Sequence, residues 1–222
     1  MSGPVTVVIS SAGLGTRLGV NTPKALAEIE GKPIVQHQLE MLHSVDDVVV
    51  VVGYMAKEVI QAVLSVRPSA AIALNHQFAS TGTAASLQIG SRIASDMVVS
   101  LDGDLLVRPD DFYRLLSAPD SCLGITGTVS KDPVCAELSD DGLHVTSLSQ
   151  DRHTPWEWSG LAKVPRESIL GFDTGHVFPG LLPSLPMRFL EVDTVEVDYP
   201  EDLETAEAWL LGRNRGKANG AR

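Results

Sequence analysis

A glycine-rich segment near the amino terminus combines a flexible backbone with fixed positive charge. An apolar run leads into residues 10–19, which read Ser-Ser-Ala-Gly-Leu-Gly-Thr-Arg-Leu-Gly. Gly13 and Gly15 allow the backbone to turn tightly and to bring its N–H groups close to an anion. Arg17 can hold phosphate oxygens in a bidentate fork, and Lys24 adds a second cation. Such a loop at the carboxyl end of a buried strand predicts a polyphosphate site.

Other glycine-loop sites fit this segment less well. A P-loop requires a lysine and then Ser or Thr directly after its second glycine, where this chain has Thr16-Arg17. A dinucleotide fingerprint requires a third glycine at the position that Leu18 occupies. A plain turn between a strand and a helix is the structural alternative, and the two cations at this spacing favour the phosphate site.

A second candidate site follows an apolar run at residues 97–101. The run ends in Asp102-Gly103-Asp104. A carboxylate at the carboxyl end of a parallel strand points into the ligand crevice of the sheet. Magnesium prefers oxygen ligands and often uses one or two carboxylates together with substrate phosphates. We therefore expect Mg²⁺ at this turn, with a simple tight turn as the alternative.

The composition limits the classes of function. The 222 residues are 44% hydrophobic, and 17 basic against 28 acidic residues give a net charge of −11. This balance argues against a nucleic-acid binder, which needs a basic surface. No apolar run reaches 18 residues, so we expect no membrane partner. Cys122 and Cys135 lack metal-ligand spacing and indicate buried thiols in a reducing, cytoplasmic environment.

Strand and helix patterns alternate through the first half of the chain. Apolar strand-like runs at 5–9, 48–52, 70–74 and 97–101 are separated by segments of helical periodicity at 34–43, 55–66 and 86–94. This alternation predicts an α/β fold with a mainly parallel central sheet flanked by helices. Short strands at 124–129, 136–138 and 143–148 then indicate a small β insertion, with a hairpin turn at residues 140–142. We expect one domain over residues 1–212 and a disordered tail over 213–222.

The glycine-rich segment, together with Pro23-Lys24, resembles the signature of the nucleotidyltransferase superfamily. These enzymes make nucleotide-diphospho sugars, alcohols and phosphonates, and their usual motif is Leu-Ala-Ala-Gly-x-Gly-Thr/Ser-Arg-Leu followed by Pro-Lys. The chain departs from it at Ser10 and Ser11, both small. Residues 26–34 match a second block of the family, and residues 196–203 resemble Glu-Ile/Val-Asp-Thr-Pro-Glu-Asp-Leu, with Tyr199 in place of Thr. The resemblance implies a single Rossmann-like domain whose β insertion covers the acceptor site.

The resemblance also implies roles for particular residues. Arg17 and Lys24 would be catalytic, and Mg²⁺ would be held by Asp104 and Asp198. Thr81-Gly82-Thr83-Ala84 resembles the segment that faces the base, although Ser80 or Thr81 could instead cap a helix. The implied nucleotide-binding residues are Ser11, Ala12, Gly13, Leu14, Gly15, Thr16, Arg17, Lys24, Asn75, Gly82, Thr83, Ser86 and Asp102.

The pattern of Asn75 with Ser86-Leu87 resembles cytidylyltransferases that act on phosphocholine, phosphonates and inositol phosphate. In such an enzyme the acceptor's phosphate oxygen attacks the α-phosphorus of the nucleoside triphosphate, and pyrophosphate leaves. CTP is therefore the first choice, with phosphocholine, a phosphonate or a polyol phosphate as acceptor. A guanylyl, thymidylyl or uridylyl transferase acting on a sugar 1-phosphate is the second choice, and a non-catalytic nucleotide-binding homologue the third. We also consider a homodimer.

The residues that would bind the acceptor are the ones that the sequence indicates least clearly. The resemblance implies that Trp158, Gly160 and Lys163 line the acceptor pocket. Trp156 and Trp158 are two apart and would face the same side of an extended strand. Their rings could hold a quaternary ammonium group, or they could pack in the core or in a dimer interface.

Overall fold

Nine strands form one sheet in the part of the chain that the computed structural model describes, residues 4–19 and 22–212. The expected tail, 213–222, lies outside the described residues. The strand order is β5-β4-β1-β6-β11-β8-β12-β10-β9. The first four of these strands pair in parallel, as the alternating sequence pattern predicts; they are β1 (Val5–Ser11), β4 (Asp47–Val52), β5 (Ala71–Leu74) and β6 (Met97–Asp102).

Parallel pairing brings the ends of these strands to one edge of the sheet. Ser10 pairs with Asp102 in the register of β1 and β6, so the glycine-rich loop and the Asp102–Asp104 turn begin side by side. The turn also depends on Gly103. Its N–H donates to the Ser10 carbonyl at 3.1 Å, and an added Cβ would lie 2.6 Å from the same oxygen.

The β insertion continues this sheet as a set of largely antiparallel strands. The long strand β11 pairs antiparallel with β6 on one side and with β8 on the other, which joins the two halves. The predicted hairpin is present between β9 and β10, with Gly142 at φ +67°. The strands of this half are β8 (Cys122–Gly127), β9 (Cys135–Leu138), β10 (His144–Ser149), β11 (Trp156–Pro165) and β12 (Met187–Glu191).

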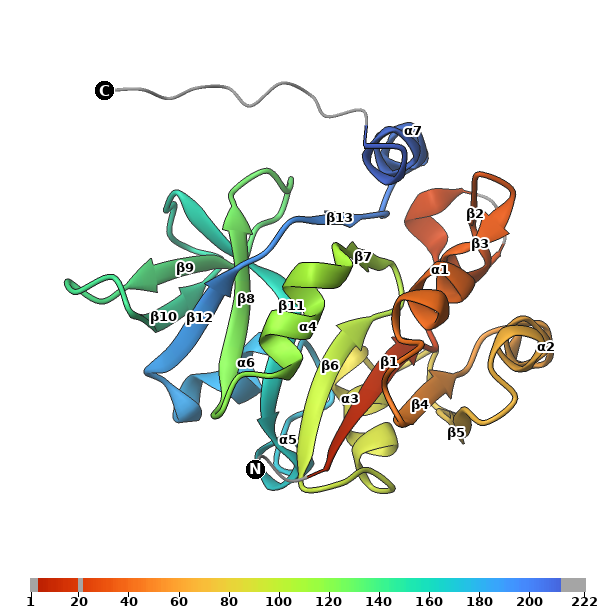
Figure 1. Ribbon diagram of the computed structural model, residues 1–222, viewed down its shortest axis with the longest axis horizontal. Helices are drawn as coiled ribbons and strands as arrows, with labels where there is room; N and C mark the ends of the chain where they lie inside the picture. Colours follow the sequence, from red (N-terminus) through yellow and green to blue (C-terminus); the bar gives the residue numbers. More distant parts are fainter. Residues whose placement is uncertain (1–3, 20–21, 213–222) are drawn as a thin grey trace.

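Helices cover both faces of the sheet (Figure 1). Side chains alternate along each strand, so Val7 and Ile9 belong to one hydrophobic cluster and Val8 to another. The first cluster packs under α1 (Ile34–Met41), α2 (Ala56–Val66) and α4 (Pro109–Leu116). The second packs under α3 (Thr83–Ser91), α5 (Arg166–Leu170) and α6 (Phe178–Leu181). No helix among the described residues is both long and apolar enough to cross a membrane.

The carboxy-terminal segment returns to the beginning of the chain. Strand β13 (Thr194–Glu196) pairs antiparallel with β7 (Leu105–Val107), which directly follows the Asp102–Asp104 turn. Helix α7 (Pro200–Leu210) packs through Ala206 on a third cluster that includes Leu18 and Ile29. A small hairpin of β2 (Glu28–Ile29) and β3 (Lys32–Pro33) supports this contact, and short 3₁₀ turns lie at Thr16–Leu18, Lys24–Leu26 and Leu182–Ser184.

Candidate nucleotide and metal site

A cleft of about 1510 Å³ opens at the carboxyl ends of β1 and β6. The glycine-rich loop, the Asp102–Asp104 turn and the residues from β13 to the start of α7 form one part of its wall. The segment 75–86 and the β8–β9 loop form the rest, together with residues 157–160. The cleft brings together every site residue expected from the sequence except Lys163.

The glycine-rich loop has the geometry that its sequence predicts. Gly15 adopts φ +65°, and an added Cβ would lie 2.8 Å from the Thr22 carbonyl oxygen, so both conformation and space require glycine there. The 3₁₀ turn Thr16–Leu18 follows Gly15, and its last residue, Leu18, is buried and anchors the turn. The side chain of Arg17 is thereby left 55% exposed at the cleft.

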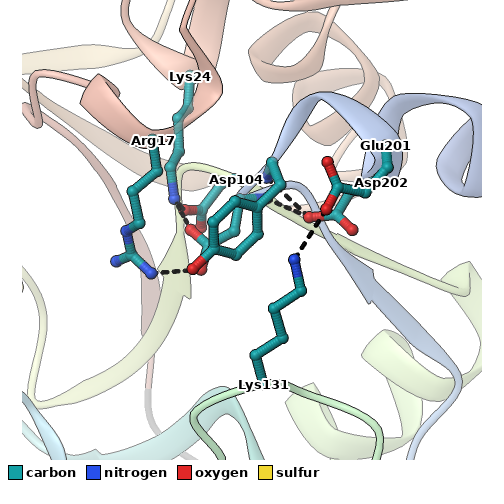
Figure 2. A network of polar contacts seen from close by, with 8 residues as sticks. Arg17, Lys24, Asp104, Lys131, Glu201 and Asp202 are labelled. Carbon is teal, nitrogen blue, oxygen red and sulfur yellow. Dashed lines mark hydrogen bonds and ion pairs between the residues drawn. The ribbon is translucent and has the colours of Figure 1, made fainter.

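Lys24 lies between two carboxylates that are far apart in the sequence (Figure 2). Its Nζ lies 2.6 Å from Asp104 Oδ2 and also donates to Asp198 Oδ1. Arg17 Nη1 lies 2.8 Å from the other oxygen of Asp198. Burial alone would lower the pKa of Lys24, but the two carboxylates raise it above its usual value and keep the ammonium charged.

A third acidic residue, Glu196, which was not expected from the sequence, lies beside Asp104 and Asp198. Oxygens of Asp104, Glu196 and Asp198 all lie within 4.8 Å of one another. The spacing of Glu196 and Asp198 could have indicated this, because residues two apart in an extended segment face the same side. Val197 between them is fully buried. The Val197 N–H donates to the Asp104 carbonyl at 3.0 Å, which fixes the two segments against each other.

Negative charge is crowded around this cluster. Burial and the neighbouring Asp104 carboxylate raise the pKa of Asp102 to about 7. Glu196 as a residue is exposed, but partial removal of its carboxyl from water, together with Asp104 and Asp198, raises its pKa to about 8. When ionised, these four carboxylates exceed the two cations Arg17 and Lys24 by two charges. An all-oxygen donor set with this excess fits a divalent cation such as Mg²⁺.

The segment 75–86 is organised by the buried amide of Asn75. Its Nδ2 donates to Thr81 Oγ1 and Ser86 Oγ, both at 3.1 Å, and its Oδ1 accepts from the Gln77 N–H at 2.9 Å. Gly82 occupies the N-cap position of α3 and makes no side-chain cap, so the alternative of a Ser80 or Thr81 cap is wrong.

Gly82 is required by a close contact with a distant loop. Its N–H donates to the Thr174 carbonyl at 2.7 Å, and an added Cβ would lie 2.2 Å from the Gly175 oxygen. Thr83 begins α3 beside it and, like Gly82, lines the cleft. The small residues at these positions therefore allow two backbone segments to meet at the wall of the cleft.

The acceptor-side residues lie at an irregularity in β11. The pairing register of β11 with β8 shifts between Trp158 and Ala162, and Gly160 within this bulge adopts φ +87°. A Cβ at Gly160 would lie 3.0 Å from Asp102 Oδ2, so the bulge brings the strand close to that carboxylate. Trp158 lines the cleft, with its Nε1 donating to the Leu161 carbonyl at 3.0 Å. Both Trp156 and Trp158 pack at the edge of the second hydrophobic cluster, and of the two only Trp158 lines the cleft.

The expectation that Lys163 lines the acceptor pocket is wrong. Lys163 is fully buried, and its Nζ donates to the carbonyls of Leu116, at 2.8 Å, and Ala118, at 2.5 Å, where α4 ends. Leu161 belongs to the first hydrophobic cluster, whereas Ala162 and Val164 belong to the second, so alternation along β11 turns Lys163 to the face covered by α4. A lysine that satisfies unpaired carbonyls at a helix terminus explains this position.

Asp202, near the carboxy terminus, caps the start of α7. Its Oδ2 accepts from the N–H groups of Asp198, at 2.9 Å, and Tyr199, at 2.8 Å, in a capping box at the start of α7. Asp202 is thus a first-turn acid of the helix, where a negative charge is favourable. The same capping orders the backbone that carries Asp198 and the ring of Tyr199.

A family model described as the MobA-like NTP transferase domain matches residues 7–149. The chain belongs to this family. The match begins in β1 and ends in β10, so it includes the glycine-rich loop, the Asp102–Asp104 turn and part of the β insertion.

Curated relatives align with part of the chain. The bifunctional protein GlmU of Paracoccus denitrificans is 32% identical over 133 residues, which are 59% of this chain and 30% of that protein. A CMP-5'-(3-aminopropyl)phosphonate synthase of Streptomyces rubellomurinus is 31% identical over 53% of this chain and 20% of that protein. Choline-phosphate cytidylyltransferase of Streptococcus pneumoniae is 41% identical over 56 residues, 23% of this chain and 24% of that protein. The aligned segments therefore cover less than a third of the length of each of these relatives.

Solved structures share the whole fold. The inositol-1-phosphate CTP transferase of T. maritima has a TM-score of 0.79 at 16% identity and covers 96% of this chain and 97% of its own. The CTP:phosphocholine cytidylyltransferase of Streptococcus pneumoniae has a TM-score of 0.77 at 20% identity and covers 94% of this chain and all of its own. These likenesses confirm the mixed α/β domain expected from the sequence.

The raised pKa of Glu196 predicts a pH-dependent stability. Its folded-state pKa of about 8 exceeds its ordinary value of 4.5, so the folded state holds more protons between these values. The contribution of Glu196 to the free energy of unfolding should therefore be fully present below about pH 4.5. It should be lost as the pH rises through about 8. Glu196→Gln does not titrate and should become more stable relative to wild type over this interval.

Urea unfolding midpoints between pH 5 and 8.5 measure this difference, with Glu204→Gln on the exposed side of α7 as the control for loss of one acidic side chain. Unfolding curves of wild type and Glu196→Gln that shift in parallel with pH would contradict the crowding of these carboxylates.

The buried position of Lys163 predicts a structural rather than a binding defect. Lys163→Met leaves two carbonyls at the end of α4 without their donor and should lower the free energy of unfolding by about 1–3 kcal/mol. Lys57→Met, an exposed lysine on α2, serves as the control. Unchanged stability of Lys163→Met together with weaker binding of phosphocholine, measured by calorimetry, would instead return this lysine to the acceptor pocket.

Proposed function

We propose that this chain is a nucleotidyltransferase that joins the nucleoside monophosphate of CTP to a small phosphorylated acceptor and releases pyrophosphate. The observation that carries the proposal is the position of Lys24 between Asp104 and Asp198 in one cleft with the glycine-rich loop. This is a site with cations for phosphates and carboxylates for a metal ion, and it lies beside a second, less charged wall formed by the β insertion.

The reaction requires positioning and charge neutralisation more than an activated nucleophile. The acceptor's phosphate oxygen is already an anion and attacks the α-phosphorus, and the bond to the leaving pyrophosphate breaks. Arg17 and the N–H groups of the loop at Gly13–Thr16 would bind the leaving pyrophosphate. Lys24 would neutralise charge that develops at the α-phosphate.

Asp104 and Asp198 would hold Mg²⁺, and Glu196 completes the group of oxygens that can reach the ion. Bound Mg²⁺ supplies positive charge to the phosphate oxygens and orients them. The ion pairs of Lys24 and Arg17 with Asp198 offset part of the negative charge of the acidic cluster. Asp102, the most buried acid of the group, would lie on the nucleotide side.

The choice of CTP is supported by two observations. Asn75 and Ser86, whose pattern resembles that of cytidylyltransferases, lie at the wall of the cleft and are hydrogen-bonded to each other. Relatives and structural neighbours include proteins named as cytidylyltransferases for phosphocholine, inositol 1-phosphate and an aminopropylphosphonate. We therefore propose an acceptor of this class, bound near Trp158 and Gly160. A structural neighbour described as a putative glucose-1-phosphate thymidylyltransferase from Bacillus anthracis makes a sugar-1-phosphate transferase the second candidate. The two buried free cysteines support a cytoplasmic enzyme.

Pyrophosphate release tests the proposal. Purified chain with Mg²⁺ is assayed with ATP, CTP, GTP, UTP or dTTP against phosphocholine, inositol 1-phosphate, 3-aminopropylphosphonate and sugar 1-phosphates. We expect release with CTP and one of the first three acceptors. Lys24→Met and Asp104→Asn should each lower kcat by on the order of 100- to 1000-fold, because each removes a charge at the transition state, while Lys57→Met should match wild type.

Other outcomes separate the alternatives. Release with GTP, UTP or dTTP and a sugar 1-phosphate would overturn the choice of CTP and keep the reaction class. No release with any pair would favour a binding-only homologue. A near-normal rate in Lys24→Met would contradict the role assigned to that lysine.

A further inference from the structure

The β8–β9 loop carries a lysine across the mouth of the cleft to the start of α7. Lys131 Nζ lies 2.8 Å from Glu201 Oε1 and 3.7 Å from the centroid of the Tyr199 ring. Figure 2 shows its side chain extending from the loop to Glu201, in the same network as Arg17, Lys24 and Asp104. Lys131 thus links the β insertion with the segment that carries Asp198.

The loop that carries Lys131 is held in place by a buried carboxylate. Glu157 is 3% exposed, and its Oε1 accepts from the N–H groups of Val129, at 3.1 Å, and Ser130, at 3.3 Å. Its Oε2 accepts from Ser130 Oγ at 2.6 Å. A charged group satisfied by three donors is costly to displace, so the backbone before Lys131 is fixed while its long side chain stays free to turn.

Lys131 is a cation of the cleft that does not contact the predicted metal ligands. Among the described residues that line the cleft, the arginine and lysine side chains are those of Arg17, Lys24 and Lys131. The first two contact the predicted metal ligands. The Lys131–Glu201 pair, by contrast, has side-chain exposures of 60% and 64%, and exposed pairs of this kind stabilise a protein by only about 0–1 kcal/mol. Another anion can therefore replace Glu201 at little cost.

The wall formed by the β insertion needs such a cation if it binds a phosphate. Asp132 and Glu157 also line this wall, and both are acidic. A phosphate or phosphonate brings about two further negative charges close to a triphosphate, and a cation must offset them. Arg17 and Lys24 face the triphosphate side in the proposed function, which leaves Lys131 for the acceptor.

Tyr199 fixes the resting position of this lysine. Its hydroxyl hydrogen-bonds with Arg17, and its ring face carries the Lys131 ammonium. The ring therefore lies between the cation of the triphosphate side and the cation of the acceptor side. Tyr199 stands where the usual family motif has Thr, a residue with no ring to hold a cation in this place.

We propose that Lys131 leaves Glu201 and binds the phosphate or phosphonate group of the acceptor, which it holds beside the metal cluster. This inference rests on the proposed function and assigns one residue to its acceptor. Lys131 is a substrate-binding residue in this account, and Glu157 and Tyr199 are positioning residues.

Steady-state kinetics of Lys131→Met test the assignment, with the acceptor that gives the highest turnover in the pyrophosphate assay. Loss of a charge-assisted contact should raise the KM for the acceptor roughly 10- to 100-fold and leave the KM for CTP within about twofold of wild type. Lys131→Arg should restore most of the loss. Lys32→Met removes a lysine from a similar exposed pair with Glu40, at 2.6 Å and outside the cleft, and should leave both constants unchanged.

A second variant tests the exchange of partners. Glu201→Gln releases Lys131 from its resting contact and should lower the KM for the acceptor by about twofold, as expected for the loss of a weak exposed pair. A raised KM in Glu201→Gln would contradict the exchange. Calorimetric titration of the acceptor into enzyme with a non-hydrolysable CTP analogue and Mg²⁺ reports the same affinities without turnover.

The outcomes distinguish this inference from the function on which it rests. If wild type turns over and Lys131→Met changes neither KM, only the lysine assignment fails. If the KM for CTP rises instead, Lys131 serves the triphosphate, and the assignment to the acceptor is overturned. If wild type releases no pyrophosphate with any acceptor, the proposed function fails and this inference fails with it.

Discussion

The structure depends on an ion cluster that joins three distant parts of the chain. Lys24 contacts Asp104, 80 residues later, and Asp198, 174 residues later. These charges are partly buried, with side-chain exposures of 16–20%, so each would be costly to leave unpaired. The cluster therefore constrains the loop after β1, the turn after β6 and the segment after β13 to meet at one edge of the sheet, where it brings cations and carboxylates together.

Strand pairing and helix capping bring these three segments together. Parallel pairing of β1 with β6 aligns the first two segments, and pairing of β7 with β13 returns the third. The capping box of α7 then orders the backbone at Asp198. The β insertion closes the other side, where the buried Glu157 holds the β8–β9 loop. Among the described residues, one wall of the cleft carries the acidic cluster with Arg17 and Lys24, and the other carries the exposed Lys131.

Most of this arrangement could be predicted from local sequence, and the misses have physical causes. The alternation of apolar runs with helical periodicity gave the parallel half of the sheet, and Asp104, Asp198 and Lys24 were correctly expected to meet. Glu196 was missed because its spacing from Asp198 was not read as a shared face. Lys163 was misplaced because alternation along β11 turns it away from the face of Trp158, toward the end of α4, where its ammonium donates to main-chain carbonyls. The contact of Lys131 with Glu201 depends on tertiary packing alone.

The central claim is that Lys24 compensates Asp104 and Asp198 until a nucleotide and a metal ion replace it. A crystal structure of the chain with Mg²⁺ and a non-hydrolysable CTP analogue tests this most directly. The account predicts a metal ion bound by oxygens of Asp104 and Asp198, with Lys24 Nζ moved onto a phosphate oxygen. An analogue bound in the cleft with Lys24 still between the two carboxylates, and the metal ion held elsewhere, would contradict it.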